Sequence, residues 1–471
     1  MLKVIIEKEI RDITGSLKFV ISFTVCAVLI LLSFYVGASN YKISMGQYEA
    51  AKAENIRQME GLTEWYSIQQ HRAFLPPNPL ASLVSGVSND IGRTIEVNHR
   101  GELIAQDSKF NEEPIYAVFQ FVDLSFIFGV VISLFAILLG YDSICGEKEH
   151  GTLRLSFANA VPRATYILGK LIGSFLTLTI SLILAILIGC LLLPALNISL
   201  TGGEWIRLML IIGTGLLYFG VFLTLSVFIS SCCRRTSSSF LMLLVIWVFS
   251  VLIIPRASVL MAGRAADVPS VDELAAQKAS FARQTWKEFN SQLSGFATGP
   301  TDDIEQTMDI FHRYMDSLTA ERDRKIDELV DRLNETRRNK QIEREKIAFA
   351  MAKISPSASL SLALSNLAGT SSELKNRFTQ TALDYRKIYN DFVNKKTGMV
   401  VGGRMVMIKI GDEEEEEPEP INPAELPEYR FDPIPLKESI SAAIVDIGIL
   451  SLFNIIFFVG AFVSFIRYDV R

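Results

Sequence analysis

Side chains that commonly bind metals or act as nucleophiles are few and scattered in this sequence. The five cysteines are Cys26, Cys145, Cys190, Cys232 and Cys233, and the four histidines are His71, His99, His150 and His312. Cys232 and Cys233 are adjacent in the chain, whereas a zinc site uses a spaced pair of cysteines. The sequence therefore does not favour a metal site.

Motifs for nucleotide and acyl chemistry are also missing from the sequence. The pattern Gly-x-x-x-x-Gly-Lys-Ser/Thr, whose backbone amides and lysine hold phosphates, does not occur. Residues Gly140 to Lys148 contain glycines and a lysine, but the spacing differs and Glu147 would repel a phosphate. The Gly-x-Ser-x-Gly and His-Glu-x-x-His patterns are absent as well. We therefore expect a chain that is not an enzyme and has no cofactor of its own.

Two polar residues, Asp446 and Asn454, interrupt the last apolar run of the chain. An ionisable side chain within a membrane costs several kcal/mol and often marks function. Asn454 lies two turns deeper than Asp446 on nearly the same helix face. Two interpretations stand equal: an intramembrane functional site, or a carboxylate that reaches the outer interface and pairs with a neighbour such as Arg207. A proton-coupled transporter is not favoured, because the sequence has no chain of buried carboxylates.

The polar stretch from Tyr141 to Lys170 separates two long apolar runs and carries charges of both signs. Four short motifs occur in it in this order: Gly146-Glu147-Lys148-Glu149, Gly151-Thr152-Leu153-Arg154, Ala160-Val161-Pro162-Arg163 and Gly169-Lys170. Their order and spacing resemble the cytoplasmic loop between the second and third spans of ABC-2 type transporter permeases. The Ser355-Pro356 step and the ending Phe465 to Arg471 resemble a subgroup with large extracytoplasmic insertions.

The resemblance implies that this loop contains a coupling helix that sits in a groove of a separate ATP-binding subunit. The residues expected to couple to that subunit are Glu147, Glu149, Gly151, Thr152, Leu153, Arg154, Leu155, Phe157, Pro162 and Arg163. The charged side chains of Glu147, Glu149 and Arg154 would make charge-assisted contacts with the subunit. The apolar ones, Leu153, Leu155 and Phe157, would fill its groove.

The elements that position this loop are apolar runs long enough to be membrane spans. The sequence has a mean hydropathy of +0.30 with 21% charged residues, a combination typical of spans joined to aqueous domains. The expected spans are 17–38, 123–140, 171–193, 205–230, 240–255 and 441–466. Residues 1–16 carry an apolar stripe that includes Glu9, which is typical of an amphipathic helix at the interface. A signal peptide competes for the first run, but its apolar part would be shorter.

The basic residues indicate the orientation of the spans. They lie on one side of a six-span chain in four groups: Lys3, Lys8, Arg11 and Lys18; Lys148, Arg154, Arg163 and Lys170; Arg234 and Arg235; Arg467 and Arg471. The positive-inside rule therefore places both termini, the coupling loop 141–170, the turn 231–239 and the tail 467–471 in the cytoplasm. All five cysteines then lie in the membrane or on the cytoplasmic side, so we expect no structural disulfide.

Two long polar segments, 39–122 and 256–440, are then expected to face outward. In the second one, Val271 to Phe296 and a long stretch from Thr301 have helical patterns. The long helix could be a rod that carries motion or one arm of a helical hairpin, and the hairpin is favoured. Residues 399–410 are β-rich and could pair with the strand pattern near Ile95. The acidic, Pro-rich stretch 412–435 is interpreted as a solvated linker rather than a calcium site.

The expected fold is thus mainly α, a polytopic membrane protein with six spans and a large, mostly helical outer domain with a small β element. The resemblance implies the permease of an ATP-binding cassette exporter in a prokaryotic plasma membrane. Its partners would be an ATP-binding subunit that holds ATP and magnesium, a second permease copy or paralogue, and lipid. A rival class is a mechanical subunit whose outer domain acts on an envelope protein without moving solute. A sensor is disfavoured for want of a cytoplasmic output domain, and the net charge of -5 gives no reason to expect nucleic acid.

Overall fold

The structure is a computed structural model that describes residues 1–63, 65, 68, 71–97, 103, 105–106, 123–158, 161–295, 304–397 and 420–467. Within these ranges, six helical segments are long and apolar enough to cross a membrane: Leu17–Arg57, Leu124–Glu149, Arg163–Ala195, Gly202–Cys232, Thr236–Ala265 and Leu436–Arg467. The expectation of a mainly α protein with six spans is therefore confirmed.

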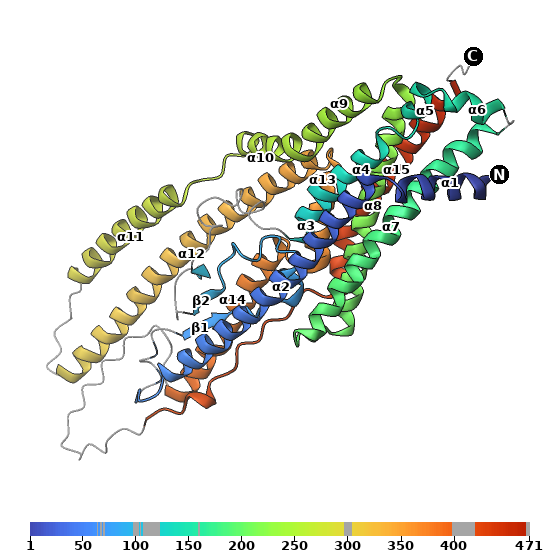
Figure 1. The fold of residues 1–471 in the computed structure, drawn as a ribbon. Helices are drawn as coiled ribbons and strands as arrows, with labels where there is room; N and C mark the ends of the chain where they lie inside the picture. The colour runs from blue at the N-terminus through green and yellow to red at the C-terminus, as the bar shows by residue number, and fades with distance from the viewer. Residues whose placement is uncertain are drawn as a thin grey trace.

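The spans form a bundle that carries both chain termini at one end (Figure 1). They are α2 (Leu17–Arg57), the broken helix α3–η5–α4–α5 (Leu124–Phe126, Ile127–Ile132, Ser133–Gly140, Cys145–Glu149), α7 (Arg163–Ala195), α8 (Gly202–Cys232), α9–η6–α10 (Thr236–Trp247, Val248–Ile253, Ile254–Ala265) and α15 (Leu436–Arg467). The short helix α1 (Leu2–Thr14) crosses the terminal end of the bundle, and α6 (Thr152–Ala158) follows α5 there.

Helix α2 is much longer than the span expected at 17–38. It begins after Ser16, whose hydroxyl accepts a hydrogen bond from Phe19 N, and it continues for 41 residues. At 1.5 Å per residue this is about 60 Å, roughly twice the thickness of a bilayer core. The first residues of the polar segment 39–122 are therefore the second half of the same helix, since no residue between the two halves breaks it.

Two spans contain a π-helical turn, η5 and η6. A π-helical turn leaves backbone carbonyls without their usual helical partners, and such turns often occur at functional sites. In η5, the carbonyl of Gly129 accepts hydrogen bonds from the hydroxyls of Tyr218 and Ser133. In η6, the carbonyl of Ser250 accepts a hydrogen bond from the Ser355 hydroxyl. Hydroxyl groups of other residues thus donate hydrogen bonds to a backbone carbonyl in each of the two π-helical turns.

Helix α13 (Pro356–Ala368) enters the bundle between α8 and α15. Ser355 caps its first turn, and Leu360, Leu364 and Leu367 are fully buried in the same core as the spans. The expected outer segment 256–440 included these residues, whereas the structure packs them against membrane helices. With 13 residues, α13 is too short to be recognised as a span from its hydropathy.

The end of the molecule opposite the chain termini, called the outer part below, consists of long helices and a small sheet (Figure 1). Its elements are α11 (Val271–Ser294), α12 (Ile304–Ala352), α14 (Glu373–Thr397), the strands β1 (His71–Phe74), β2 (Thr94–Val97) and β3 (Ala105–Gln106), and the 3-10 turns η2 (Pro79–Ser82) and η7 (Pro423–Glu425). Helices α11 and α12 lie side by side, with Lys278 Nζ donating to Asn334 Oδ1 at 2.7 Å. The long helix is therefore one arm of a hairpin.

The three strands form an antiparallel sheet in the order β1–β2–β3, in which Ile95 pairs with Ala73 and Ala105. The β-rich residues 399–410 and the acidic run 412–417, which entered the expectations for this region, lie outside the described residues. Below the sheet, α14 contributes Phe378, Tyr385 and Tyr389 to two apolar clusters that hold the strands in place.

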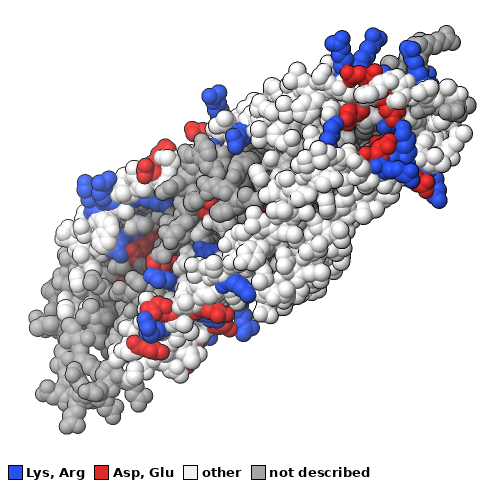
Figure 2. All heavy atoms as spheres, viewed as in Figure 1, with Lys and Arg blue, Asp and Glu red and all other residues white. Residues whose placement is uncertain are grey.

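Charged side chains are distributed unevenly along the molecule. Figure 2 shows Lys, Arg, Asp and Glu gathered at the end that carries the termini and again in the outer half, with a broad uncharged zone between them. Large apolar side chains such as Leu191, Leu241 and Ile455 are exposed on the spans. An exposed apolar belt between two charged zones is the surface expected where lipid surrounds a protein.

Candidate functional site

The two short helices α5 and α6 make up the polar segment that follows the second span. They are joined by His150 and Gly151, and Gly151 has a φ of +73°, a left-handed conformation that glycine adopts without strain. Ser230 fixes the start of α5, since its hydroxyl accepts hydrogen bonds from the backbone amides of Ile144 and Cys145, each at 3.0 Å. The segment is thereby seated on the end of α8.

Glu147 of α5 lies in a buried network of charges with Lys170 of α7 and Glu9 of α1. Lys170 Nζ is 3.0 Å from Glu147 Oε1 and 3.0 Å from Glu9 Oε2, and the three side chains are between 7% and 14% exposed. Tyr166 donates its hydroxyl hydrogen to Glu147, and Ser174 donates to Glu9 at 3.1 Å. One ammonium ion thus joins two carboxylates from different elements.

Helix α1 approaches α7 closely enough to form this network because α7 presents glycines to it. A Cβ atom on Gly169 would lie 2.7 Å from Ile5 Cγ2, and one on Gly173 would lie 2.8 Å from Glu9 Cβ. Both glycines are therefore required by the close approach of the two helices. The apolar stripe of α1 faces the bundle, with Ile13 buried, as an interfacial amphipathic helix requires.

The remaining polar residues around α5 contact the ends of other spans. Glu149 Oε2 accepts hydrogen bonds from the amide and the hydroxyl of Thr236, the first residue of α9, at 3.0 and 2.9 Å. Lys148 donates to the carbonyls of Ser231 and Cys233 at the end of α8. The carboxylate thus lies at the positive end of one helix and the ammonium at the negative end of another, as the helix dipole favours.

Two further contacts complete the connections to the spans. Asp142 forms an ion pair of 2.6 Å with Lys18 at the start of α2. Arg163, the first residue of α7, donates to the carbonyl of Ile466 at the end of α15. Within the described residues, the segment from Asp142 to Arg163 therefore contacts α1. It also contacts each of the other five spans, at the end of the bundle that carries the chain termini.

The expected coupling residues divide into those that face inward and those that remain accessible. Glu147 is held in the charge network, and Leu153 is 2% exposed within an apolar cluster that includes Phe157 and Phe465. Leu153 and Phe157 therefore pack against this chain's own helices instead of standing free to fill a partner's groove. Arg154 and Leu155 face outward, and the side chain of Leu155 is 69% exposed.

Thr152 and Pro162, two more of the expected coupling residues, contact or adjoin helices of this chain. The Thr152 hydroxyl lies 3.4 Å from the Glu147 carbonyl, and Pro162 immediately precedes α7. Of the partners revealed by the structure, Glu9 had a signal in the sequence, because it falls within the apolar stripe of residues 1–16. Its contact with Lys170 joins positions 161 residues apart, which no local pattern can show.

Asp446 and Asn454 both bind neighbours inside the bundle. Asp446 is 2% exposed and pairs with Lys353 at the end of α12, with Nζ and Oδ1 2.9 Å apart. The alternative partner Arg207 instead donates to the carbonyl of Leu367 at 2.9 Å and to Ser439 Oγ at 2.8 Å. Asn454 donates to the Leu217 carbonyl at 3.0 Å and so links α15 to α8.

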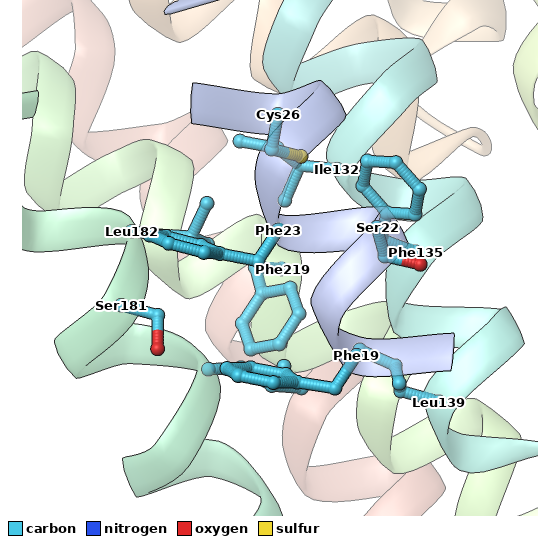
Figure 3. Close-up of a pocket in the computed structure, with 11 residues that line it drawn as sticks. Phe19, Ser22, Phe23, Cys26, Ile132, Phe135, Leu139, Ser181, Leu182 and Phe219 are labelled. Carbon is cyan, nitrogen blue, oxygen red and sulfur yellow. The ribbon is translucent and has the colours of Figure 1, made fainter. Parts of the chain in front are cut away.

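A small cavity lies between α2, α4, α7 and α8 (Figure 3). Its volume is about 20 Å³, and Phe19, Phe135 and Phe219 are among the side chains that surround it. Ser22 and Ser181 also line it, and the space could hold about one water molecule by volume, which is too little for a substrate. It is therefore not a candidate for a substrate site.

The fold and the polar segment define a class of protein: a polytopic membrane protein whose spans are joined at one end by a short polar element. The chain belongs to the ABC-2 family transporter proteins, since the family model matches residues 3–470. It is therefore a membrane subunit of the ABC transporter permease type, and such subunits are not normally catalytic themselves.

A similarity to a curated protein agrees with this family. The chain is 34% identical over 131 residues to the probable ABC transporter permease protein NosY of Pseudomonas aeruginosa. The match covers 27% of this chain and 46% of that relative, so the chain matches about half of the relative's length.

Proposed function

We propose that this chain is the permease of an ATP-binding cassette exporter and that α5 and α6 couple its spans to a separate ATP-binding subunit. That subunit would bind ATP and magnesium, and a second copy or paralogue of this chain would complete the membrane part. Both termini would lie in the cytoplasm of a prokaryotic cell. The observation that carries the proposal is that one short segment contacts the same end of every other span.

The exposed face of α6 is the part of this segment that can receive a partner. Arg154 offers a charge and Leu155 an apolar side chain on the same short helix. The buried charges that join α5 to α1 and α7 resist separation, because moving α5 away would take Glu147 from Lys170 and leave that buried ammonium with one carboxylate fewer. A displacement of α5 and α6 would therefore move α1 and α7 together and shift the ends of α8, α9 and α15.

Replacing Leu155 with aspartate tests the partner contact. We expect the ATP-binding subunit to bind the permease roughly 30-fold more weakly, because a central apolar contact in an interface is worth about 2 kcal/mol. Binding is measured by co-purification and by titration of the labelled subunit onto the permease in nanodiscs. The melting temperature should not change, since Leu155 is exposed in the isolated chain.

The matched control is Arg234→Glu, a substitution at an exposed position on the same end of the bundle but outside α6. It should leave binding within a factor of about 2, as exposed single charges contribute little. Wild-type binding by the Leu155→Asp protein would overturn the assignment of α6 as the contact.

A mechanical function is the second candidate, and helix α2 favours it. This helix runs without a break from the ion pair of Lys18 to the outer domain. There Asn55 Oδ1 accepts a hydrogen bond from the amide of Arg72 in β1, and Lys52 pairs with Glu428 at 2.7 Å. A tilt of the span would thus be transmitted to the outer sheet, where an envelope protein could respond.

A proline in the outer half of α2 separates transport from mechanical transmission. Glu49→Pro should break the exposed part of the helix at a local cost of about 3 kcal/mol, with Glu49→Ala as control. If the protein is a mechanical subunit, ATPase activity of the complex should persist in the proline variant, while spin-label distances between the span α7 and strand β1 stop responding to ATP. Unaltered distance changes in the proline variant would count against mechanical transmission through α2.

A further inference from the structure

A groove of about 300 Å³ lies where α8, η6, α13 and α15 meet. This volume falls at the lower end of the range of small-molecule sites. It is lined by residues of these elements, by neighbouring residues of α9 and α10, and by Ile354 between α12 and α13; among them are Val221, Leu225, Ser250, Phe453 and Phe457. Ser250 is the one polar side chain among the described residues of the lining, so the groove suits an apolar ligand.

The groove is open on the exposed side of the bundle. Phe249 and Ile354, which lie at its margin, are 53% and 68% exposed, whereas Val221 and Leu225 at its base are buried. Phe249 belongs to the apolar surface of the spans, where the surrounding medium is lipid. A ligand would therefore enter sideways from the bilayer, without crossing an aqueous vestibule.

The hydroxyl of Ser250 is the second observation that indicates a ligand. Ser250 is 8% exposed, and its Oγ has no hydrogen-bond partner among the described residues. Its backbone carbonyl is already bonded to Ser355, so η6 holds the residue in place. A buried hydroxyl without a partner costs free energy, and a polar atom of a ligand could remove that cost.

The groove is apolar along its length and charged beyond one end. Phe453 and Phe457 are one turn apart on α15, and Asp446 lies two turns from Phe453 on the same face. Its partner Lys353 directly precedes Ile354 of the lining and has a side chain that is 29% exposed. The ion pair therefore lies at the groove end that points away from the chain termini.

We propose that this groove binds the acyl chain of an amphiphilic molecule whose ester carbonyl accepts a hydrogen bond from Ser250 and whose polar head lies beside Lys353. The arrangement matches such a molecule in polarity, with an apolar channel for the chain and a charged pair for the head. The inference deepens the proposed function by naming an acyl-bearing substrate class, and it rests on that function only for the step of transport. Binding itself requires neither ATP nor the partner subunit.

The experiment uses the purified permease in nanodiscs with phosphatidylglycerol that carries a photoreactive group in its acyl chain. After illumination, mass spectrometry of peptides should find the label concentrated on residues 245–257 and 353–360. Two variants fill the groove, Ser250→Leu from η6 and Val221→Phe from α8, and each should reduce labelling of these peptides about tenfold. Leu252→Phe, on the same helical turn but outside the lining, should retain it.

Three results would overturn the proposal. The label could be spread evenly over exposed spans such as α7. The variants that fill the groove could be labelled like the parent. Peptides of the groove could be found cross-linked to a second copy of the chain and carry no lipid label. The peptide map of the parent protein decides the matter even if a filling variant fails to fold. Since no step involves the ATP-binding subunit, a negative result here leaves the coupling role of α6 untouched, and the reverse also holds.

Discussion

Replacing Lys170 with alanine is expected to destabilise the permease by about 3 to 5 kcal/mol, the usual cost of removing one partner from a buried ion pair. The reason is geometric: Glu9 and Glu147 would remain buried on either side of the lost ammonium. Glu9 would then lose its cation altogether, and Glu147 would keep only the half-exposed Lys8, whose Nζ is 3.4 Å from Glu147 Oε1. Thermal unfolding of the purified protein, followed by the fluorescence of a thiol-reactive dye, measures the change.

Two controls separate the loss of the network from a general sensitivity to charge. Lys3→Ala removes a similar pair on α1, but that pair is 88% and 62% exposed, so the variant should unfold like the parent. The triple variant Lys170→Met, Glu9→Gln, Glu147→Gln has no buried charge and should regain most of the stability. A Lys170→Ala protein as stable as the parent would contradict the buried network.

The triple variant also tests whether the buried charges contribute to coupling as well as to stability. In the proposed mechanism α5 is attached to α1 and α7 through Lys170, so neutral side chains should hold the same fold with a weaker connection. We therefore expect the triple variant to bind the ATP-binding subunit normally while its ATPase activity responds less to the permease. If the triple variant is stable and the ATPase activity still responds fully to the permease, the charge network contributes to folding alone.

The spans could be predicted from the sequence, whereas their true lengths could not. Uninterrupted apolar runs identify a span because backbone and side chains must both suit lipid. The runs end where polar residues begin, but helix α2 continues for a further 19 residues beyond the expected end at residue 38, since polar helix formers extend it to Arg57. Helix α13 was missed because a short buried helix and an outer loop of small residues have similar composition.

The polar segment was located by its motifs, but the directions of its side chains were not predictable. Helix α5 has 5 residues and α6 has 7, so neither is long enough to show a periodic pattern that separates the inner face from the outer one. Glu147 and Leu153 were for this reason expected to face a partner, yet both are turned into the bundle. Their buried partners come from α1, α7 and α15, which only the tertiary structure brings together.

The outer domain is expected to lose stability between pH 6.5 and pH 4 because of one histidine, His71 in β1. Burial lowers the pKa of His71 from 6.5 to about 4. Its Nε2 atom lies 2.6 Å from Tyr385 Oη, and Tyr385 donates its own hydrogen to the Pro427 carbonyl. His71 therefore donates from Nε2, and the buried Nδ1, which has no partner among the described residues, is the atom that an added proton would occupy.

The direction of the pH effect on stability follows from the pKa of His71 in the unfolded chain, 6.5, and in the folded chain, about 4. Between pH 6.5 and pH 4 the unfolded chain binds the proton and the folded chain does not, so stability rises with pH in this window. The contribution is complete above about pH 6.5 and disappears as the pH falls to about 4. A lowering of 2.5 pKa units corresponds to about 3 kcal/mol at most. The charged pair Arg72 and Glu96 lies at the adjacent register position, on the opposite face of the sheet, and does not face the imidazole.

His71→Gln tests this account, because the glutamine amide can still donate to Tyr385 but does not titrate. We expect hydrogen exchange at residues 71–74 and 94–97, corrected for its intrinsic pH dependence, to become faster in the parent below pH 6 and to change much less in the variant. His312→Gln, at an exposed position on α12, should follow the parent. If the parent and the His71→Gln protein open equally at pH 5, carboxylates elsewhere and not His71 determine the acid sensitivity of the sheet.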